Sequence, residues 1–368
     1  MAENKVTVNH LPVLTWNRLK INSAEADISK TACNSIIYDL PKGISSRRVD
    51  FETALSEFEA LSGSVRRESF VAGKVPIYNE QSFLTGMGKG VDDYITASAI
   101  PAEIIDIPAG VNLSEPFKIT VSGESSVFIK AGSDCLADII FDLENTDLIS
   151  LRVFSDFGSQ VKISMARTKN KAQLMSDFGA YLQKSASLEL YTVLLGAEKI
   201  YSGFGIDMTG DNSRFKGELA YLRGYGEEQD INYNVIQRGR ETVSDFNFRG
   251  VLLDGGSKTL RDTIDFRRGA TGAIGNEQEN VLIATKKENS ILNKSIPLIL
   301  CEEEDVDGRH GASIGRIDPR TILYMESRGF TPEEARRLLI HGHIGSVARS
   351  IPDKNINKAV EEYLEARI

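Results

Sequence analysis

The sequence predicts a mainly β protein whose core lies between a mixed N-terminal region and a helical C-terminal region. From about residue 115 to about residue 302, short apolar and alternating segments follow one another with almost no helical pattern between them. The 31 glycines and only 10 prolines suit a chain with many tight turns. The last fifty residues change to a helical period with clear capping signals. The predicted regions are 1–100, 101–316 and 317–368.

The N-terminal region begins with an extended segment, and a helix is predicted over Val49–Leu61. In that helix Phe51, Leu55 and Phe58 recur at spacings of four and three, which places them on one face. The stretch Gly63–Ser98 is rich in glycine, serine and charge, and we expect it to loop over the surface.

The central region consists of predicted strands separated by Gly, Asn, Asp and Ser turns. They continue without a linker beyond the length at which β-sandwiches and barrels usually close, which favours a β-solenoid. A pair of β-sandwiches stays the alternative, because the repeat is degenerate. The predicted strands are Phe117–Val121, Val127–Lys130, Ile139–Leu143, Ile149–Phe154, Val161–Ala166, Leu188–Leu195, Phe215–Leu222, Ile231–Ile236, Thr242–Leu253 and Lys258–Phe266.

Three helices are predicted in the C-terminal region. Asp318–Pro319 supplies an N-cap and a proline at the first helical position, and Gly329 ends this helix. Thr331–Glu334 is a capping box that opens a second helix, and Asp353 opens a third. The region is amphipathic and has as many basic as acidic residues, so it predicts a packing or docking element.

Composition excludes several classes of protein. Lysine and arginine number 43 against 52 acids, and the net charge of −9 disfavours a nucleic-acid-binding surface. Three cysteines exclude a disulfide framework and indicate a reducing compartment. The opening residues lack a signal-peptide core and no apolar run could span a membrane, so we expect a soluble, cytoplasmic protein. Neither a Walker A motif nor a G-x-S-x-G elbow is present, which argues against a nucleotide-hydrolysing or serine-hydrolase site.

Cysteine and histidine spacing alone nominates no metal site. Cys33, Cys135 and Cys301 form no CxxC pair, and the first two are expected to be buried structural thiols. Cys301 follows an apolar strand and precedes acids, so it could line a site. His341 and His343 lie two apart on a predicted helix and point away from each other, so they cannot share an ion.

The segment Glu304–Gly329 is informative as a whole, beyond the spacing of its single histidine. Glu304–Gly329 reads EDVDGRHGASIGRIDPRTILYMESRG and closely resembles the C-terminal signature of the SufB/SufD family. Members of that family are scaffold-type subunits of the Suf machinery for iron–sulfur cluster assembly. Arg249–Leu252, Asp265–Ile274, Glu279–Ile283 and the lead segment Leu11–Leu19 are also similar to the family.

The resemblance implies a right-handed parallel β-helix core flanked by N- and C-terminal helical regions. It also implies that the C-terminal region docks onto SufC, an ABC-type ATPase, and that the β-helix pairs with a SufB-like paralogue. The expected cargo is a transient iron–sulfur cluster at the subunit interface. A flavin in the assembled complex is compatible with the family, although no motif of this sequence indicates one.

Two positions imply the SufD type rather than the cluster-bearing SufB type. Gln278 stands where SufB carries a cysteine, and Gly311 stands where SufB has a glutamate directly after the signature histidine. That histidine is His310, which in SufD faces the partner's cluster-building cysteine. One imidazole without a local thiolate cannot hold a cluster alone, but it can complete a site whose thiolates come from another chain.

Two alternatives accompany this expectation. A self-sufficient homodimeric scaffold would use Glu277, Glu279, His310 or Cys301 as ligands. In the SufD type, some members carry a thiol at the position of Gly308, and its role is either lost here or taken by Cys301. A carbohydrate-active β-helix enzyme would need a pair of carboxylates in a groove. No spacing nominates such a pair among the acids of the core, namely Asp207, Asp211, Glu218, Asp230 and Asp245.

Overall fold

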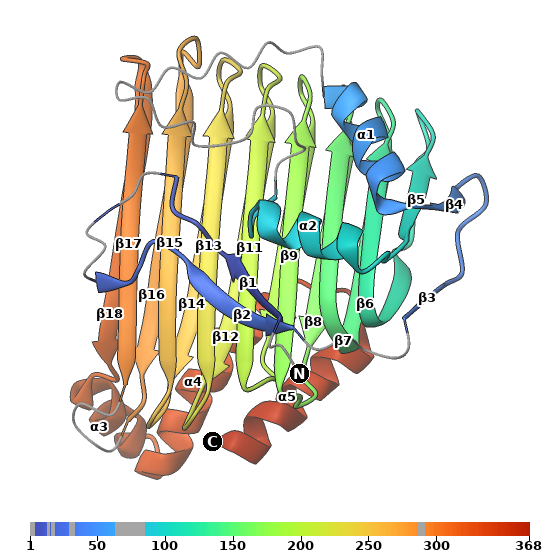
Figure 1. Ribbon diagram of the computed structural model, residues 1–368. Helices are drawn as coiled ribbons and strands as arrows, with labels where there is room; N and C mark the ends of the chain where they lie inside the picture. The colour runs from blue at the N-terminus through green and yellow to red at the C-terminus, as the bar shows by residue number, and fades with distance from the viewer. Residues whose placement is uncertain (1–3, 13–14, 16–18, 29–33, 63–84, 286–290) are drawn as a thin grey trace.

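Alternating side chains build a two-sheet solenoid in the central region, as a computed structural model shows (Figure 1). The structure describes residues 4–12, 15, 19–28, 34–62, 85–285 and 291–368. The chain passes between two parallel sheets, which are joined by the long strand β7 (Leu136–Ser155). One sheet continues through β9 (Gln173–Leu182), β11 (Lys199–Met208), β13 (Glu228–Gln237), β15 (Ser257–Phe266) and β17 (Leu292–Cys301). The other continues through β8 (Gln160–Arg167), β10 (Ser187–Leu194), β12 (Arg214–Arg223), β14 (Val243–Leu252), β16 (Ala273–Ile283) and β18 (Val306–Arg316).

The prediction of a parallel β-helix core with a mixed N-terminal region and C-terminal helices is therefore confirmed, and the sandwich alternative is wrong. Inward side chains from both sheets form one continuous hydrophobic core. In the middle turns this core is aromatic: the ring centroids of Phe246 and Phe248 lie 4.5 Å apart, and those of Tyr233 and Phe246 lie 4.7 Å apart. Each turn buries its inner face against its neighbours, which is how a solenoid obtains its stability.

The N-terminal elements cover the outer face of the sheet that contains β9, β11 and β13 (Figure 1). Arg152 of β7 is fully buried, and its Nη2 lies 2.7 Å from Asp92 Oδ1 and 2.6 Å from Asp177 Oδ2. Because Asp92 belongs to α2 (Lys89–Ala97), this ion pair holds α2 against the face. The covering elements are β1 (Asn4–Val8), β2 (Ala24–Ile28), α1 (Phe51–Ser62) and α2. Strands β5 (Ala102–Ile107) and β6 (Phe117–Ala131) belong to the first turns of the solenoid, and β3 (Ser35–Tyr38) and β4 (Ser45–Val49) pair with them.

The prediction that Gly63–Ser98 is a surface loop is wrong for its last part. Helix α2 occupies Lys89–Ala97 there, and it buries Val91, Tyr94 and Ile95. These apolar residues lie three and four apart among charged neighbours, so a composition-based estimate overlooks them. Residues 63–84 of the predicted loop lie outside the described residues.

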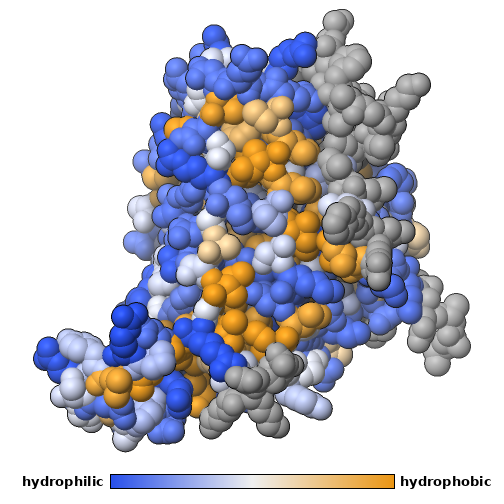
Figure 2. Space-filling model, turned by 90° about the vertical axis from the view of Figure 1, so that its left-hand side faces the viewer, coloured by the Kyte–Doolittle hydropathy of each residue, from blue (hydrophilic) through white to orange (hydrophobic). Residues whose placement is uncertain are grey.

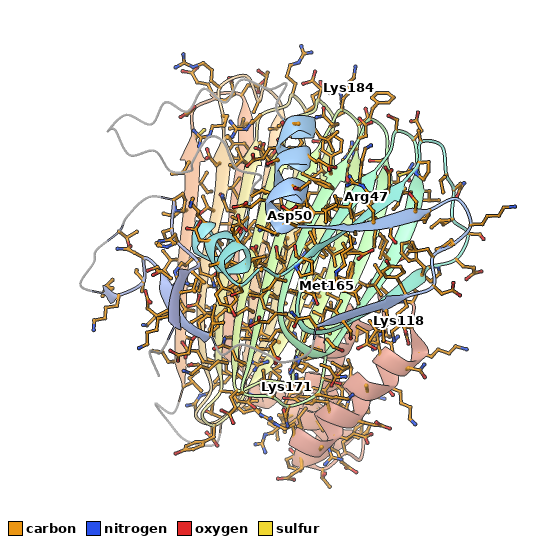
Figure 3. The ribbon with its side chains drawn as sticks, turned by 45° about the vertical axis from the view of Figure 1, so that its right-hand side comes forward. Arg47, Asp50, Lys118, Met165, Lys171 and Lys184 are labelled. Carbon is orange, nitrogen blue, oxygen red and sulfur yellow. The ribbon has the colours of Figure 1, made fainter. Side chains whose placement is uncertain are left out.

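The three predicted C-terminal helices are present as α3 (Pro319–Ser327), α4 (Pro332–Ala348) and α5 (Lys354–Arg367). Their capping signals are confirmed: Asp318 and Asp353 accept hydrogen bonds from backbone N–H groups, and Thr331 forms a capping box with Glu334. Helices α4 and α5 pack on the outer face of the sheet that contains β10, β12 and β14. Lys118 lies beside these helices, with its Nζ 3.2 Å from Asp353 Oδ2 (Figure 3).

The solenoid extends further than the predicted strands. Residues 306–316 form β18, so His310 lies inside the last strand instead of at a junction that follows it. The inward positions of β18 are occupied by Gly308, His310 and Ala312. None of these is a large apolar residue, so the sequence lacks the apolar alternation that predicts a strand. Strands β9 and β11 were not predicted either, because they are buried on both faces and lack alternation.

The two ends of the solenoid differ. At the first turn, β4 pairs antiparallel with β5 and β3 pairs antiparallel with β6. At the other end, β17 pairs only with β15 and β18 only with β16 within the described part of the chain. Leu292, Ile299 and Ile314 are 49%, 44% and 43% exposed there. Figure 2 shows this end, where apolar patches lie between charged residues.

Among the described residues, no helix is long and apolar enough to cross a membrane.

Candidate metal centre

The last turns of the solenoid bring three potential ligands together in its interior. Asp262 lies on β15 next to Tyr233 of β13, and Glu277 lies on β16 next to His310 of β18. Strands β15 and β16 belong to opposite sheets, so their inward side chains face each other across the interior. Asp262, Glu277 and His310 can therefore meet although 48 residues separate the first from the last (310 − 262).

The donor atoms of these three residues all lie within 4.8 Å of one another. His310 Nδ1 is 3.1 Å from Asp262 Oδ2 and 3.9 Å from Glu277 Oε2. The side chains of Asp262 and Glu277 are 0% and 1% exposed, whereas that of His310 is 19% exposed. The cluster is thus buried on its carboxylate side and accessible on its imidazole side.

Burial and like charge shape the protonation of this cluster. Loss of solvent, followed by the negative charge of Asp262, raises the pKa of Glu277 well above its ordinary value. The adjacent Asp262 carboxylate raises the pKa of His310, and this effect outweighs the burial that lowers it. Like charges repel strongly in a buried cluster whose donor atoms lie within 4.8 Å, so the site favours either a proton on Glu277 or a positively charged ligand.

A buried ion pair lies next to this cluster. Lys258 Nζ contacts Glu279 Oε1, and it also donates to Lys294 O at 3.1 Å and to Ser295 Oγ at 2.9 Å. Ser295 Oγ in turn donates to Glu279 Oε2 at 2.5 Å. Burial lowers the pKa of Lys258, and the charge of Glu279 opposes that effect. Glu279 is thus committed to Lys258.

The sequence-predicted residues separate into two groups. The structure brings His310 and Glu277 together, while Glu279 binds Lys258 and stands outside the three-residue group. Cys301 ends β17 beside Phe266, four residues along the strand from the level of Asp262, which corresponds to roughly 13 Å. It is exposed, and its Sγ donates to Glu303 O at 2.9 Å. The assignments of His310, Glu277, Glu279 and Cys301 to a cluster site stay predictions.

Cys135 and His343 have structural surroundings. Cys135 is buried, and burial raises the pKa of its thiol to about 11, so it is a poor thiolate ligand. Cys33 lies outside the described residues. His343 Nε2 is 3.1 Å from the carbonyl oxygen of Asn280, and burial lowers the pKa of His343.

Asp262 was missed by the sequence reasoning, although a signal for it exists. In the predicted strand Lys258–Phe266 the inward positions include Leu260, Asp262 and Ile264, so an acid interrupts an apolar alternation. A charged residue in the inward row of a buried strand costs free energy unless it has a partner. An interruption of this kind therefore predicts a cation or an ion pair inside the core.

The acids that could have served a carbohydrate-active enzyme are engaged elsewhere. Asp207 binds Arg238, Asp211 binds Arg240 and Asp230 binds Arg261, in each case at 3.0 Å or less.

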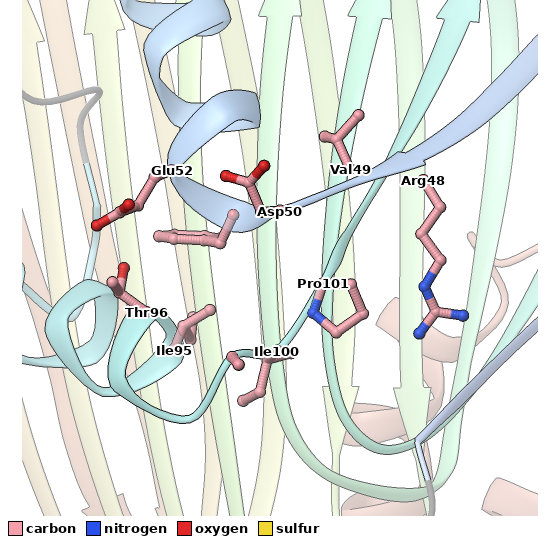
Figure 4. A pocket seen from close by; sticks show the side chains of 10 residues that line it. Arg48, Val49, Asp50, Glu52, Ile95, Thr96, Ile100 and Pro101 are labelled. Atoms are coloured by element: carbon pink, nitrogen blue, oxygen red, sulfur yellow. The ribbon is translucent and has the colours of Figure 1, made fainter.

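A surface pocket of about 450 Å³ lies between the start of α1 and the end of α2 (Figure 4). Its Asp50 accepts hydrogen bonds from Thr53 N and Thr53 Oγ1, which is the role of a helix cap.

Comparison with known proteins places this site in context. A family model described as "SUF system FeS cluster assembly, SufBD core domain" matches residues 124–343, more than half of the chain. The chain is 30% identical over 146 residues to the iron–sulfur cluster assembly protein SufD of Bacillus subtilis. It is 23% identical over 189 residues to the iron–sulfur cluster assembly protein SufB of the same organism. An iron–sulfur cluster assembly SufBD family protein of Mycobacterium leprae is 21% identical over 192 residues.

Each of these matches covers only part of this chain and only part of the relative. They cover 39%, 50% and 51% of this chain for the Bacillus SufD, the Bacillus SufB and the Mycobacterium protein. They cover 33%, 40% and 22% of those relatives.

Proposed function

The chain belongs to the SufBD family of iron–sulfur cluster assembly proteins, and on that premise we propose that it is a SufD-like, non-catalytic subunit. It pairs with a SufB-like scaffold and a SufC-like ABC ATPase in the cytoplasm, and this complex builds and transfers iron–sulfur clusters. The observation that carries the proposal is the position of His310, which lies in the last strand of the solenoid beside the open end. An imidazole there can reach a cluster held by a second chain.

Pairing through the open end is supported by β17 and β18, whose outer edges have no strand partner in the described part of the chain. Exposed strand edges with apolar neighbours favour the addition of further strands, and a paralogous solenoid supplies them. Thiolates for the nascent cluster would come from the partner, because Cys301 and Cys135 are distant or buried.

Docking of the ATPase is supported by α3 and the start of α4. Helix α3 buries none of its residues, and Leu323 and Tyr324 are 64% and 58% exposed. Phe330 and Leu338 continue this apolar surface at 41% and 48% exposure. Apolar surface of this kind on a helical region suits a protein partner. ATP-driven movement of the ATPase would then rearrange the solenoid interface through the C-terminal helices.

A self-sufficient homodimer is the second candidate. The observation in its favour is that Glu277 and His310 already lie together in this chain, within ligand distance of Asp262. Two copies paired at their open ends would hold two such groups near the interface.

An anaerobic pull-down of the tagged full chain tests the proposal. We expect recovery of an ABC-type ATPase together with a cysteine-bearing paralogue. Recovery of the ATPase with only further copies of this chain and a brown chromophore would establish the homodimer instead. If neither the ATPase nor a paralogue is retained, the assignment to a Suf-type complex is wrong.

A further inference from the structure

We infer that Asp262, Glu277 and His310 form a binding site for one divalent first-row metal ion, held by this chain without ligands from a partner. The choice of Fe²⁺ as the ion that the site takes in the cell rests on the proposed function. The site itself rests only on the three side chains. It would load a single iron atom before any cluster exists, which is a different task from ligating a cluster at the interface.

The first argument is that the buried polar atoms of the site lack hydrogen bonds of normal geometry, although His310 Nδ1 and Asp262 Oδ2 lie at ion-pair distance. Within the described residues, neither oxygen of Asp262, nor Glu277 Oε1, nor His310 Nδ1 makes a hydrogen bond of normal geometry. Native proteins rarely leave several buried polar atoms unsatisfied in one place, because each unmet group costs free energy. Three side chains from three strands that share this property converge on one point, and one cation would satisfy all of them.

The second argument is that the nearby lysine cannot serve as that cation. The ammonium of Lys258 has three donors, and Glu279, Ser295 and the carbonyl oxygen of Lys294 use them. Tyr233 is the neighbour of Asp262 along the sheet, and its hydroxyl also has no hydrogen-bonding partner among the described residues. The charge of Lys258 lowers the pKa of Glu277, but its three donors are used outside the three ligands, so the imidazole of His310 is the basic group that lies within ion-pair distance of them.

The third argument is the spacing of the donors. Two ligands bound at about 2.1 Å and at a right angle lie about 3.0 Å from each other, and two on opposite sides of the ion lie about 4.2 Å apart. His310 Nδ1 is 3.1 Å from Asp262 Oδ2 and 3.9 Å from Glu277 Oε2, so both distances fall within this range. An ion could bind with small side-chain movements.

The fourth argument is the chemistry of the donors. Two carboxylate oxygens and one imidazole nitrogen suit Fe²⁺, Mn²⁺, Co²⁺ and Zn²⁺, whereas sulfide-bridged clusters prefer thiolates. The absence of a thiol from this three-residue group thus favours a mononuclear ion. Three protein donors leave coordination positions for water or for a donor from a second chain. Exposure of His310 alone, at 19%, places the entry on the side of the last strand.

Titration of the metal-free full chain with Co²⁺, Mn²⁺ and anaerobic Fe²⁺ tests the inference. We expect one ion per chain, with the weak visible bands of Co²⁺ bound by oxygen and nitrogen and without thiolate charge-transfer bands. Asp262→Asn and Glu277→Gln keep the shape of each side chain and should each weaken binding by about tenfold or more. At the same concentration, Co²⁺ should raise the thermal unfolding temperature of Asp262→Asn clearly less than that of the wild type.

Two matched variants serve as controls. Asp307→Asn makes the same change at an exposed aspartate of β18, and Cys301→Ser removes the exposed thiol; both should bind Co²⁺ like the wild type. Circular dichroism confirms that each variant is folded. Absence of saturable binding to the wild type, or undiminished binding to Asp262→Asn and Glu277→Gln, overturns the inference. Partner recovery in the pull-down without metal binding would leave the proposed function standing and refute only the metal site.

Discussion

Phe246 and Glu277 are register partners on β14 and β16, and both are buried. Between these two residues the interior of the solenoid changes from stacked aromatic rings to charged side chains. Glu277 is buried at this boundary, and burial is the main reason that its pKa is raised. The polar end of the interior is therefore a low-dielectric site that begins at a defined turn.

The Lys258–Glu279 pair provides a stability prediction. Both side chains are 0% exposed, so Lys258→Met leaves a buried carboxylate without its partner and should lower the free energy of unfolding by about 3–5 kcal/mol. Replacing both residues in Lys258→Met/Glu279→Leu should recover most of that loss, because no uncompensated charge remains. Urea unfolding of the four proteins of the cycle measures the coupling. Lys89→Met, at an exposed ion pair with Asp93, is the control and should change stability little. Additive effects of the two core substitutions would contradict the prediction.

Asp92 gives the protein a pH dependence. Burial in the first place, opposed by Arg152 and assisted by Asp177, raises the pKa of Asp92 from 3.8 to about 6. Between these values the folded protein holds a proton that the unfolded chain has released. The free energy of unfolding should therefore fall as the pH rises from about 4 to 6, by about 3 kcal/mol, and this contribution should be constant above pH 6.

Urea unfolding at pH 4, 5, 6 and 7 measures this contribution in Asp92→Asn, which should show a shallower decline over the same window. Asp93→Asn, at the exposed neighbouring position, should follow the wild type. Parallel curves for wild type and Asp92→Asn would show that Asp92 ionises in the folded protein near its ordinary pKa.

The exposed face of α3 predicts where the ATPase binds. Leu323→Ser and Tyr324→Ser should each weaken capture of the ATPase by about tenfold or more, because central apolar residues dominate such interfaces. The thermal unfolding temperature should not change, since α3 buries none of its residues. Tyr225→Ser is the matched control, because Tyr225 is 91% exposed in a turn far along the chain from α3. Equal capture by all three variants would place the docking surface elsewhere.

The position of His310 predicts that its loss affects cluster maturation but not assembly of the protein complex. His310→Ala should leave folding and partner recovery intact and impair cluster maturation, because the imidazole lies at the accessible side of the site. Cluster formation and transfer by the purified complex, followed by absorbance, measures the effect. His341→Ala on α4 controls for the loss of an imidazole. A variant complex that builds and transfers clusters at the wild-type rate would exclude His310 from the assembly site.

The fold was largely predictable because its signals are local. The caps at Asp318, Thr331 and Asp353 depend on residues within one helical turn, and each was confirmed. Alternation in strands such as Phe215–Leu222 is equally local. Strand β18 was not predicted as a strand, because its inward residues are glycine, histidine and alanine. Only the pairing of β18 with β16 shows that these residues face the interior. Helix α2 was missed for the opposite reason, since its charged residues mask a buried face.

The candidate site was only half predictable. His310 was singled out through the family signature around it, and Glu277 through its position beside Gln278. Asp262 comes from a different strand of the opposite sheet, and no spacing along the chain connects it with the other two. Only the stacking of turns converts these distant positions into neighbours.

The asymmetry of the two ends also limits how large an assembly can grow. A chain with unpaired parallel strands at both ends could add copies without limit and form a fibre. Within the described residues the first turn carries the short antiparallel strand β4 with Arg47 and Arg48, which disfavours further pairing there, so we expect the proposed partner at the β17–β18 end. In the proposed pair, the open strand edges of both chains would be covered by each other. Growth would then stop at two solenoids, and a pair of unlike or identical chains would be a closed assembly.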